Sequence, residues 1–196
     1  MSAPRAVLLI KVDTLGDLIL FAPALQALRT GWPKARIVAV IRQAYVGFAD
    51  LLAPGVEWLG TQLDPFTRSP AADPAELARL REAVAALQPD IVAAATGRRN
   101  WLEIALASAA PTARKIALGA DSADEFFDTQ LRVQLGLDSA VAFSETITAP
   151  ADEPDWRRNH RLASALLGRP VESTAPALAP ADAGTAALLA QLQLTP

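Results

Sequence analysis

Continuous apolar runs alternate with amphipathic segments along the chain. Residues 6–12 and 36–42 are nearly all apolar and often β-branched, a pattern typical of strands buried on both faces of a sheet. Residues 18–29 lie between them and carry apolar side chains at helical spacing, with Pro23 as a kink or a late helix start. The pattern predicts a strand, a helix and a second parallel strand.

The same alternation continues through the next hundred residues. Asp73, Pro74 and Glu76 supply an N-cap, a first-turn proline and an N3 carboxylate, which predict a helix that ends before Pro89. We expect further strands at residues 56–60, 90–95, 115–119 and 143–147, and further helices at residues 45–52, 101–109, 125–135 and 155–167. Strands that alternate with helices predict an α/β fold, doubly wound around a mainly parallel sheet.

The domain is expected to close with the helix at residues 155–167, since Gly168 and Pro170 terminate it. We therefore assign residues 1–172 to one Rossmann-like domain. Residues 173–183 are rich in Ala, Pro and Ser, as in linkers, and residues 184–194 have one more helical pattern. We interpret residues 173–196 as a linker and the first helix toward a further domain.

The amino-acid composition excludes several classes of function for this chain. The 196 residues are 52% hydrophobic and 20% charged, which supports a sizeable core in a globular chain. The net charge of −3 argues against duplex nucleic acid as a partner. With no Cys and a single His, His160, the sequence excludes disulfides, thiol nucleophiles and multi-histidine metal sites. Neither a signal peptide nor an apolar run of membrane-spanning length is present, which predicts a cytoplasmic protein.

The loop after the first strand reads D-T-L-G-D, from Asp13 to Asp17. It matches neither the dinucleotide fingerprint nor the phosphate loop, so nicotinamide, flavin and P-loop functions lose most of their support. A carboxylate here could take a proton from a substrate hydroxyl, or it could only cap the following helix. For Asp13 the alternatives are a cap, a loop-orienting role or a salt bridge to Lys11.

The loop at residues 96–100 reads T-G-R-R-N and should open at the same end of the sheet. Gly97, Arg98, Arg99 and Asn100 offer donors that suit a phosphate or a carboxylate, although paired arginines can also be merely solvated. We therefore treat anion binding and a solvated surface as open alternatives. His160 is expected to be a partly exposed residue on a late helix.

These segments together resemble glycosyltransferase family 9, the ADP-heptose:lipopolysaccharide heptosyltransferases and their relatives. The resemblance rests on the D-x-x-G-D loop, the P-A-L at residues 23–25, the W-P at residues 32–33, and the segments PDIVAAATGRRNWLEIALASAA and RRNHRLASALLGRPVE. It implies the Rossmann-like N-terminal half of a GT-B fold. It also implies Asp17 as the general base, with substrate-binding residues Thr14, Gly16, Gly97, Arg98 and Arg99.

The resemblance covers the N-terminal domain only, the half that holds the acceptor in this family. It implies transfer of a heptose-like sugar with inversion to a lipopolysaccharide-type glycan or glycolipid, with no cofactor or metal. The nucleotide-sugar donor would be bound only by a C-terminal domain. The family's activity implies a cytoplasmic enzyme, either free in the cytoplasm or in peripheral contact with the inner membrane. Alone, the chain is expected to be inactive. The alternative is a non-catalytic binding module, and the sequence does not separate a truncated chain, a split enzyme and a degenerate remnant.

Overall fold

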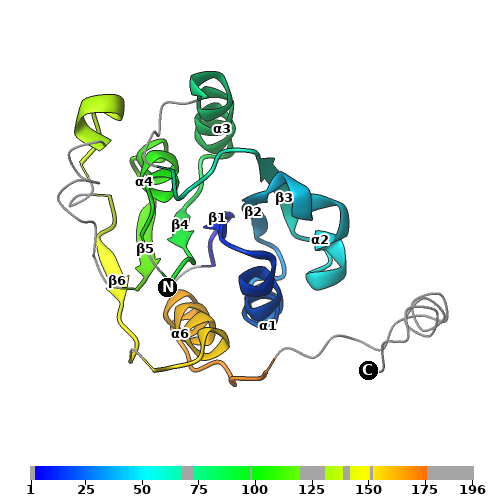
Figure 1. Cartoon of the computed structure of the whole chain (residues 1–196). Coiled ribbons are helices and arrows are strands. Elements are labelled where there is room, and N and C mark those ends of the chain that lie inside the picture. The colour runs from blue at the N-terminus through cyan, green and yellow to red at the C-terminus, as the bar shows by residue number, and fades with distance from the viewer. Residues whose placement is uncertain are drawn as a thin grey trace.

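The computed structural model describes residues 3–67, 73–97, 99–119, 131–138, 142–150 and 152–175. Within them, strands and helices alternate as predicted (Figure 1). The strands are β1 (Ala6–Ile10), β2 (Arg36–Arg42), β3 (Glu57–Thr61), β4 (Ile91–Ala94), β5 (Arg114–Leu118) and β6 (Glu145–Ile147). The helices are α1 (Leu15–Gly31), η1 (Gln43–Tyr45), α2 (Val46–Leu52), α3 (Pro74–Leu87), α4 (Trp101–Ser108) and α6 (Asp155–Leu167).

The described strands form one six-stranded sheet in the order β3-β2-β1-β4-β5-β6, and every neighbouring pair is parallel. The predicted doubly wound α/β fold is therefore confirmed. β1 and β4 lie side by side at the centre of the sheet, with Ile10 opposite Ala94 at their carboxyl ends. From this point the chain winds outward in both directions, so the sheet has its topological switch point between β1 and β4.

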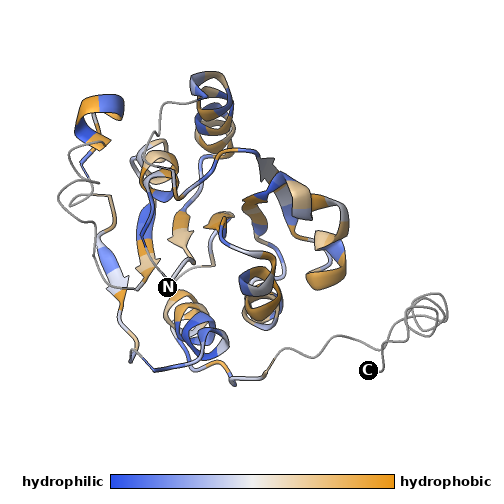
Figure 2. Cartoon of the chain, viewed as in Figure 1, coloured by the Kyte–Doolittle hydropathy of each residue, from blue (hydrophilic) through white to orange (hydrophobic). Residues whose placement is uncertain are grey.

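Two helix layers cover the sheet (Figure 1). Alternate strand residues such as Val7 and Leu9 pack with α1 and α6 on one face. Leu8 and Ile10 pack with α3 and α4 on the other. Both faces of β1 are thus buried, which explains why its sequence is apolar throughout. Figure 2 shows that α6, by contrast, carries both hydrophilic and hydrophobic residues, as expected of a helix with one face toward solvent.

Helix α1 begins three residues earlier than the sequence pattern predicted. Thr14 caps it, and Asp17 completes a capping box, so the first turn forms before the apolar stripe starts. Pro23 lies inside the helix and neither starts nor ends it. One turn before this proline, the Leu20 carbonyl accepts a hydrogen bond from Asn159 Nδ2 of α6, at 3.1 Å. That bond ties the first helix of the chain to the last described one.

Other predicted elements differ from the structure by a residue or two. The first strand ends at Ile10 rather than at residue 12. The Lys11 amide still donates a hydrogen bond to the Val40 carbonyl, at 2.9 Å, and the chain turns away from the sheet beyond this residue. The predicted helix at 125–135 lies partly outside the described residues, and residues 131–135 are helical. The predicted helix at 184–194 lies wholly outside them.

Candidate functional site

A cavity of about 260 Å³ opens at the carboxyl ends of β1, β4 and β5, at the switch point of the sheet. In open α/β sheets this is where ligands bind. The two loops that the sequence singled out both contribute to it. The described lining residues are Lys11, Asp13, Asp17, Phe66, Ala95, Thr96, Gly97, Leu118, Asp155, Arg158 and Asn159.

Asp17 lines this cavity and also caps α1. Its Oδ2 accepts hydrogen bonds from the Thr14 amide at 3.1 Å and from Thr14 Oγ1 at 2.6 Å, and Thr14 Oγ1 accepts one from the Asp17 amide at 3.4 Å. The capping interpretation is therefore observed in full. Because the side chain also borders the cavity and is only half-buried, its position is compatible with a second role toward a ligand.

Thr14 and Gly16 complete the first loop. Both are exposed. A Cβ atom at Gly16 would meet only Thr14 Oγ1, at 3.7 Å, which is an ordinary contact distance. No described residue therefore requires a glycine here. The small residue leaves the backbone of the first helical turn accessible from outside.

Lys11 and Asp13 form a buried ion pair between the two central strands. Lys11 Nζ donates to Asp13 Oδ2 at 2.8 Å and to the Ala95 carbonyl at 2.9 Å. The two residues are 4% and 8% exposed. Burial raises the pKa of Asp13, and the Asp17 carboxylate raises it further, while Lys11 opposes both effects. Of the alternatives open for Asp13, the salt bridge to Lys11 is observed.

The second loop is fixed by a buried carboxylate that the sequence analysis missed. Glu103 is 1% exposed and accepts hydrogen bonds from the Thr96 amide at 3.3 Å, the Thr96 hydroxyl and the Asn100 amide at 3.2 Å. Asn100 Oδ1 in turn accepts the Glu103 amide at 3.1 Å, which makes a capping box at the start of α4. Burial raises the pKa of Glu103 to about 7. The N-x-x-E spacing is the signal that could have revealed it.

Gly97 lies in the cavity wall and packs against the end of β5. Gly119 has a φ of +89°, and a Cβ atom there would lie 2.5 Å from the Gly97 carbonyl oxygen. Gly119 is therefore required both by its backbone conformation and by the close approach of the two chains. This requirement could not be read from the sequence, because it depends on the pairing of two distant loops.

The arginines of this loop do not share one environment that the structure can describe. Arg98 lies outside the described residues. Arg99 is 8% exposed, and its guanidinium carbon lies 4.4 Å from the centre of the Phe143 ring, in a cation–π contact. The described lining of the cavity includes Gly97 but not Arg99. The role of these arginines in anion binding stays a prediction.

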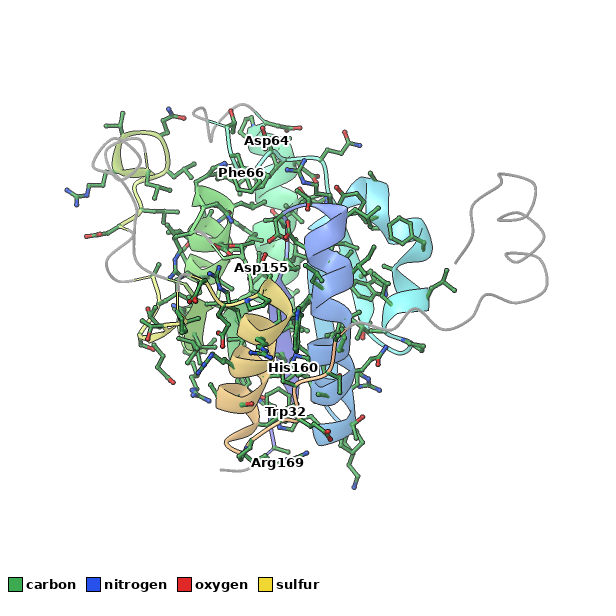
Figure 3. The ribbon with its side chains drawn as sticks, turned by 60° about the horizontal axis from the view of Figure 1, so that its bottom comes forward. Trp32, Asp64, Phe66, Asp155, His160 and Arg169 are labelled. Carbon is green, nitrogen blue, oxygen red and sulfur yellow. The ribbon has the colours of Figure 1, made fainter. Side chains whose placement is uncertain are left out.

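Helix α6 supplies a wall of the cavity that the sequence analysis did not place there. Asp155, Arg158 and Asn159 lie in its first turns and line the cavity, and Arg158 Nη1 pairs with Asp155 Oδ1 at 3.3 Å. Figure 3 shows Asp155 at the end of α6 that lies toward Phe66, on the loop after β3, with His160 farther from Phe66. Only the sheet order brings α6 beside α1, so no local pattern could have shown it.

The expectation of a partly exposed His160 is wrong. Its side chain is buried, with the residue 3% exposed, because α6 packs against α1 and residues 171–175 fold back over it. Nδ1 lies 2.7 Å from the Trp156 carbonyl, and Nε2 accepts the Thr174 amide at 3.4 Å. Both nitrogens are thus used within the fold, and the described lining of the cavity does not include His160.

No group of three or more His, Asp or Glu residues within the described ranges could hold a metal ion. Among the same residues, no helix is both long enough and apolar enough to cross a bilayer. The features that remain are a parallel sheet in the order 3-2-1-4-5-6 and a carboxylate-bearing cavity at its switch point. They define the class of this domain, which is a Rossmann-like α/β unit.

Solved structures of glycosyltransferase family 9 share this fold. E. coli heptosyltransferase WaaC with ADP-2-deoxy-2-fluoro heptose is 19% identical with a TM-score of 0.61, and the alignment covers 89% of this chain and 52% of that one. E. coli ADP-heptose lps heptosyltransferase II is 12% identical with a TM-score of 0.63, with coverage of 97% and 51%. The family 9 glycosyl transferase from Veillonella parvula is 14% identical with a TM-score of 0.60, with coverage of 97% and 50%.

The chain therefore spans about half the length of the solved structures that it matches. The sequence matches no protein-family model and no curated protein. At these identities the likeness establishes the fold, and the predicted resemblance to family 9 is confirmed at that level.

Proposed function

We propose that this chain is the acceptor-binding half of an inverting glycosyltransferase, with Asp17 as its general base. The observation that carries the proposal is the position of Asp17, which borders the cavity at the switch point of a GT-B-type half. In the reaction, Asp17 takes the proton of an acceptor hydroxyl as that oxygen forms a bond to the anomeric carbon of the donor sugar. The bond from this carbon to the diphosphate breaks, and its electron pair leaves with the nucleotide.

The donor would be a nucleotide sugar held by a second, C-terminal domain. One of the similar structures contains ADP-2-deoxy-2-fluoro heptose, which supports a heptose-like donor for this chain. The acceptor would be a lipopolysaccharide-type glycan or glycolipid. We place the reaction in the cytoplasm, with peripheral contact at the inner membrane where such an acceptor is presented.

Substrate-binding roles follow from the two loops. Thr14 and Gly16, which are exposed beside Asp17, would contact the acceptor at the edge of the cavity, and Gly97 would contact it from the cavity lining. Arg98 and Arg99 would bind an anionic group of the acceptor, a phosphate or a sugar-acid carboxylate. The pairing of two arginines with planar, forked donors is what supports this last role.

Asp17→Asn tests the base because it separates proton transfer from helix capping. Asparagine keeps an oxygen that accepts the Thr14 amide, so α1 should remain capped and the melting temperature should change little. Asparagine cannot take a proton at neutral pH. When the chain is combined with a donor-binding half, we expect the turnover rate to fall by roughly two to four orders of magnitude.

The matched control is Asp73→Asn, which makes the same carboxylate-to-amide change at the N-cap of α3, where Asp73 Oδ1 accepts the Glu76 amide at 3.0 Å. Asp73 does not belong to the described lining of this cavity, so the control should leave turnover within about threefold of wild type. A transferase rate of Asp17→Asn close to that of wild type would refute the assignment of the base. A complex with both halves that transfers no sugar at all would favour the alternative, a non-catalytic binding module.

A further inference from the structure

Asp155 presents an accessible carboxylate to the cavity from the first residue of α6. It belongs to the cavity lining, and its side chain is 46% exposed. Helix α6 begins without a side-chain cap, so this carboxylate is not used to cap the helix, in contrast to Asp17 on α1. Two carboxylates that a ligand can reach therefore line the cavity, one from each of two helices that pack together.

Arg158 holds the Asp155 carboxylate in place through one of its two oxygens. Nη1 of Arg158 donates to Asp155 Oδ1 at 3.3 Å, and Nη2 donates to the Pro150 carbonyl at 3.2 Å. A Cβ atom at Gly97 would lie 3.9 Å from the same Nη1, so the guanidinium also borders the second loop of the cavity. Oδ2 of Asp155 accepts no hydrogen bond from a described residue and remains for a ligand. A group fixed before the ligand arrives loses little conformational entropy on binding.

The charges that line the cavity argue against an anionic ligand inside it. Lys11 is paired with Asp13, and Arg158 is paired with Asp155. Asp17 then adds a further carboxylate, so the described lining has a formal charge of −1. A phosphate would be repelled here, whereas a hydroxyl can donate to a carboxylate in a charge-assisted hydrogen bond.

Phe66 offers an apolar surface to the same cavity. It is 53% exposed, and Figure 3 shows Asp155 at the end of α6 that lies toward it. The loop that carries Phe66 is held by Trp101 Nε1, which donates to the Asp64 carbonyl at 3.0 Å. A half-exposed aromatic ring beside accessible carboxylates suits a ligand with both C–H and O–H groups, as a sugar ring has.

We propose that the cavity holds a neutral sugar ring of the acceptor, and that Asp155 Oδ2 accepts a hydrogen bond from a ring hydroxyl other than the one that Asp17 deprotonates. This inference rests on the proposed function for the identity of the ligand as the acceptor. Asp155 is thus a specificity-determining residue. A sugar that lacks the hydroxyl at that ring position takes the carboxylate out of water without giving it a donor, and binds more weakly.

Saturation-transfer NMR on the 196-residue chain tests the proposal without any donor. The probes are the methyl α-glycosides of glucose, mannose and galactose, their monodeoxy derivatives, and inorganic phosphate as a competitor. We expect at least one methyl glycoside to bind with a millimolar dissociation constant that phosphate does not affect. For that glycoside, removal of one particular hydroxyl should weaken binding by about tenfold or more.

Asp155→Asn identifies the residue that recognises this hydroxyl. Asparagine keeps an oxygen for the Arg158 N–H and then turns its amide NH2 toward the cavity, where a hydroxyl cannot donate to it. The variant should therefore bind the parent glycoside about tenfold or more weakly, with little change in melting temperature. The sensitive deoxy derivative should bind the variant within about threefold of its parent, because the hydroxyl and the carboxylate act as a pair.

The matched control is Asp152→Asn, which makes the same change at an exposed residue outside the described cavity lining and should leave all affinities unchanged. Phe66→Ala should weaken every bound glycoside several-fold without changing which hydroxyl matters, since the ring contacts the C–H face of the sugar.

Four results would overturn the inference: no glycoside binds, phosphate displaces the glycoside, every monodeoxy derivative binds wild type as well as its parent does, or Asp155→Asn keeps the full sensitivity to the missing hydroxyl. These results are separable from a failure of the proposed function, because no sugar is transferred in this experiment. The expected glycoside profile together with no effect of Asp17→Asn on transfer would refute the base and leave the role of Asp155 standing.

Discussion

Glu103→Gln should change how the stability of the fold depends on pH. The Glu103 carboxyl is fully enclosed, and burial raises its pKa from 4.5 to about 7 in the folded state against the opposing effects of the Thr96 hydrogen bond and the Arg99 charge. Between these two pH values the native protein keeps a proton that the unfolded chain has already released. The stability that Glu103 contributes is therefore fully present below about pH 4.5 and is lost as the pH rises through about 7.

The magnitude follows from the interval of roughly 2.5 pH units between the two pKa values. At 1.36 kcal/mol per unit, wild type should lose about 3 kcal/mol of unfolding free energy over this range that Glu103→Gln does not lose. Glutamine also replaces one acceptor oxygen by an amide, and one of the Thr96 or Asn100 amides then loses its partner. That second effect, about 1–3 kcal/mol, is independent of pH and shifts the whole curve of the variant.

The assay is urea unfolding followed by tryptophan fluorescence, at several pH values from about 4.5 to about 8, for both proteins. The quantity of interest is the difference between their unfolding free energies, because the other titrating groups are common to both and cancel. Thr96→Val serves as a second variant: it removes a hydrogen bond that lowers the pKa of Glu103, so its loss of stability should extend to higher pH. Parallel curves for wild type and Glu103→Gln would refute the argument from burial.

Two further predictions concern the framework of the site. Gly119→Ala should lower the unfolding free energy by about 2–4 kcal/mol, because the new Cβ meets the Gly97 carbonyl at 2.5 Å and the φ of +89° strains any side chain. The control is Gly136→Ala, because Gly136 also has a positive φ but a Cβ atom there would meet no other atom within 4 Å. This variant should lose only about 1 kcal/mol of unfolding free energy. Equal losses in the two variants would show that the close approach to Gly97 is not the cause. Leu25→Ala, in the core between α1 and the sheet, should lower the unfolding free energy by about 3–5 kcal/mol in the same assay. Its control is Leu51→Ala, at a residue that is 84% exposed, which should cost less than about 0.5 kcal/mol. Similar losses in both variants would contradict the assignment of Leu25 to the core.

The elements with strong local patterns could be predicted well from the sequence. The bounds predicted for β2 and α6 agree with the structure, because an uninterrupted apolar run and a clear amphipathic stripe each define their own limits. The start of α1 was predicted less well, since the capping box of Thr14 and Asp17 adds a turn before the apolar stripe. A proline inside that helix suggested a boundary that tertiary packing overrides.

The candidate site was predictable only where it follows a strand. The loops after β1 and β4 could be named because parallel strands present their carboxyl ends to one edge of a sheet. Three features depend on which elements become neighbours in the fold. They are the contribution of α6 to the cavity wall, the burial of His160, and the buried Asp13 Oδ1 oxygen that accepts no hydrogen bond from a described residue. Glu103 is an intermediate case, because its N-x-x-E spacing is local while the contact with Thr96 arises from the strand-to-helix turn.

The bond between Asn159 and the Leu20 carbonyl has a consequence for the order in which the molecule takes shape. It joins residues 139 positions apart, and Asn159 belongs to the cavity wall. Contacts of such separation form late, after loop-closure entropy has been overcome, and a chain emerging from the ribosome cannot make this one until α6 has been synthesised. The central strands β1 and β4 can pair earlier, but the face of α1 that α6 covers stays open until then. A competent binding cavity is thus the last feature to appear, and ligand binding during refolding would report the docking of α6 rather than the formation of the sheet.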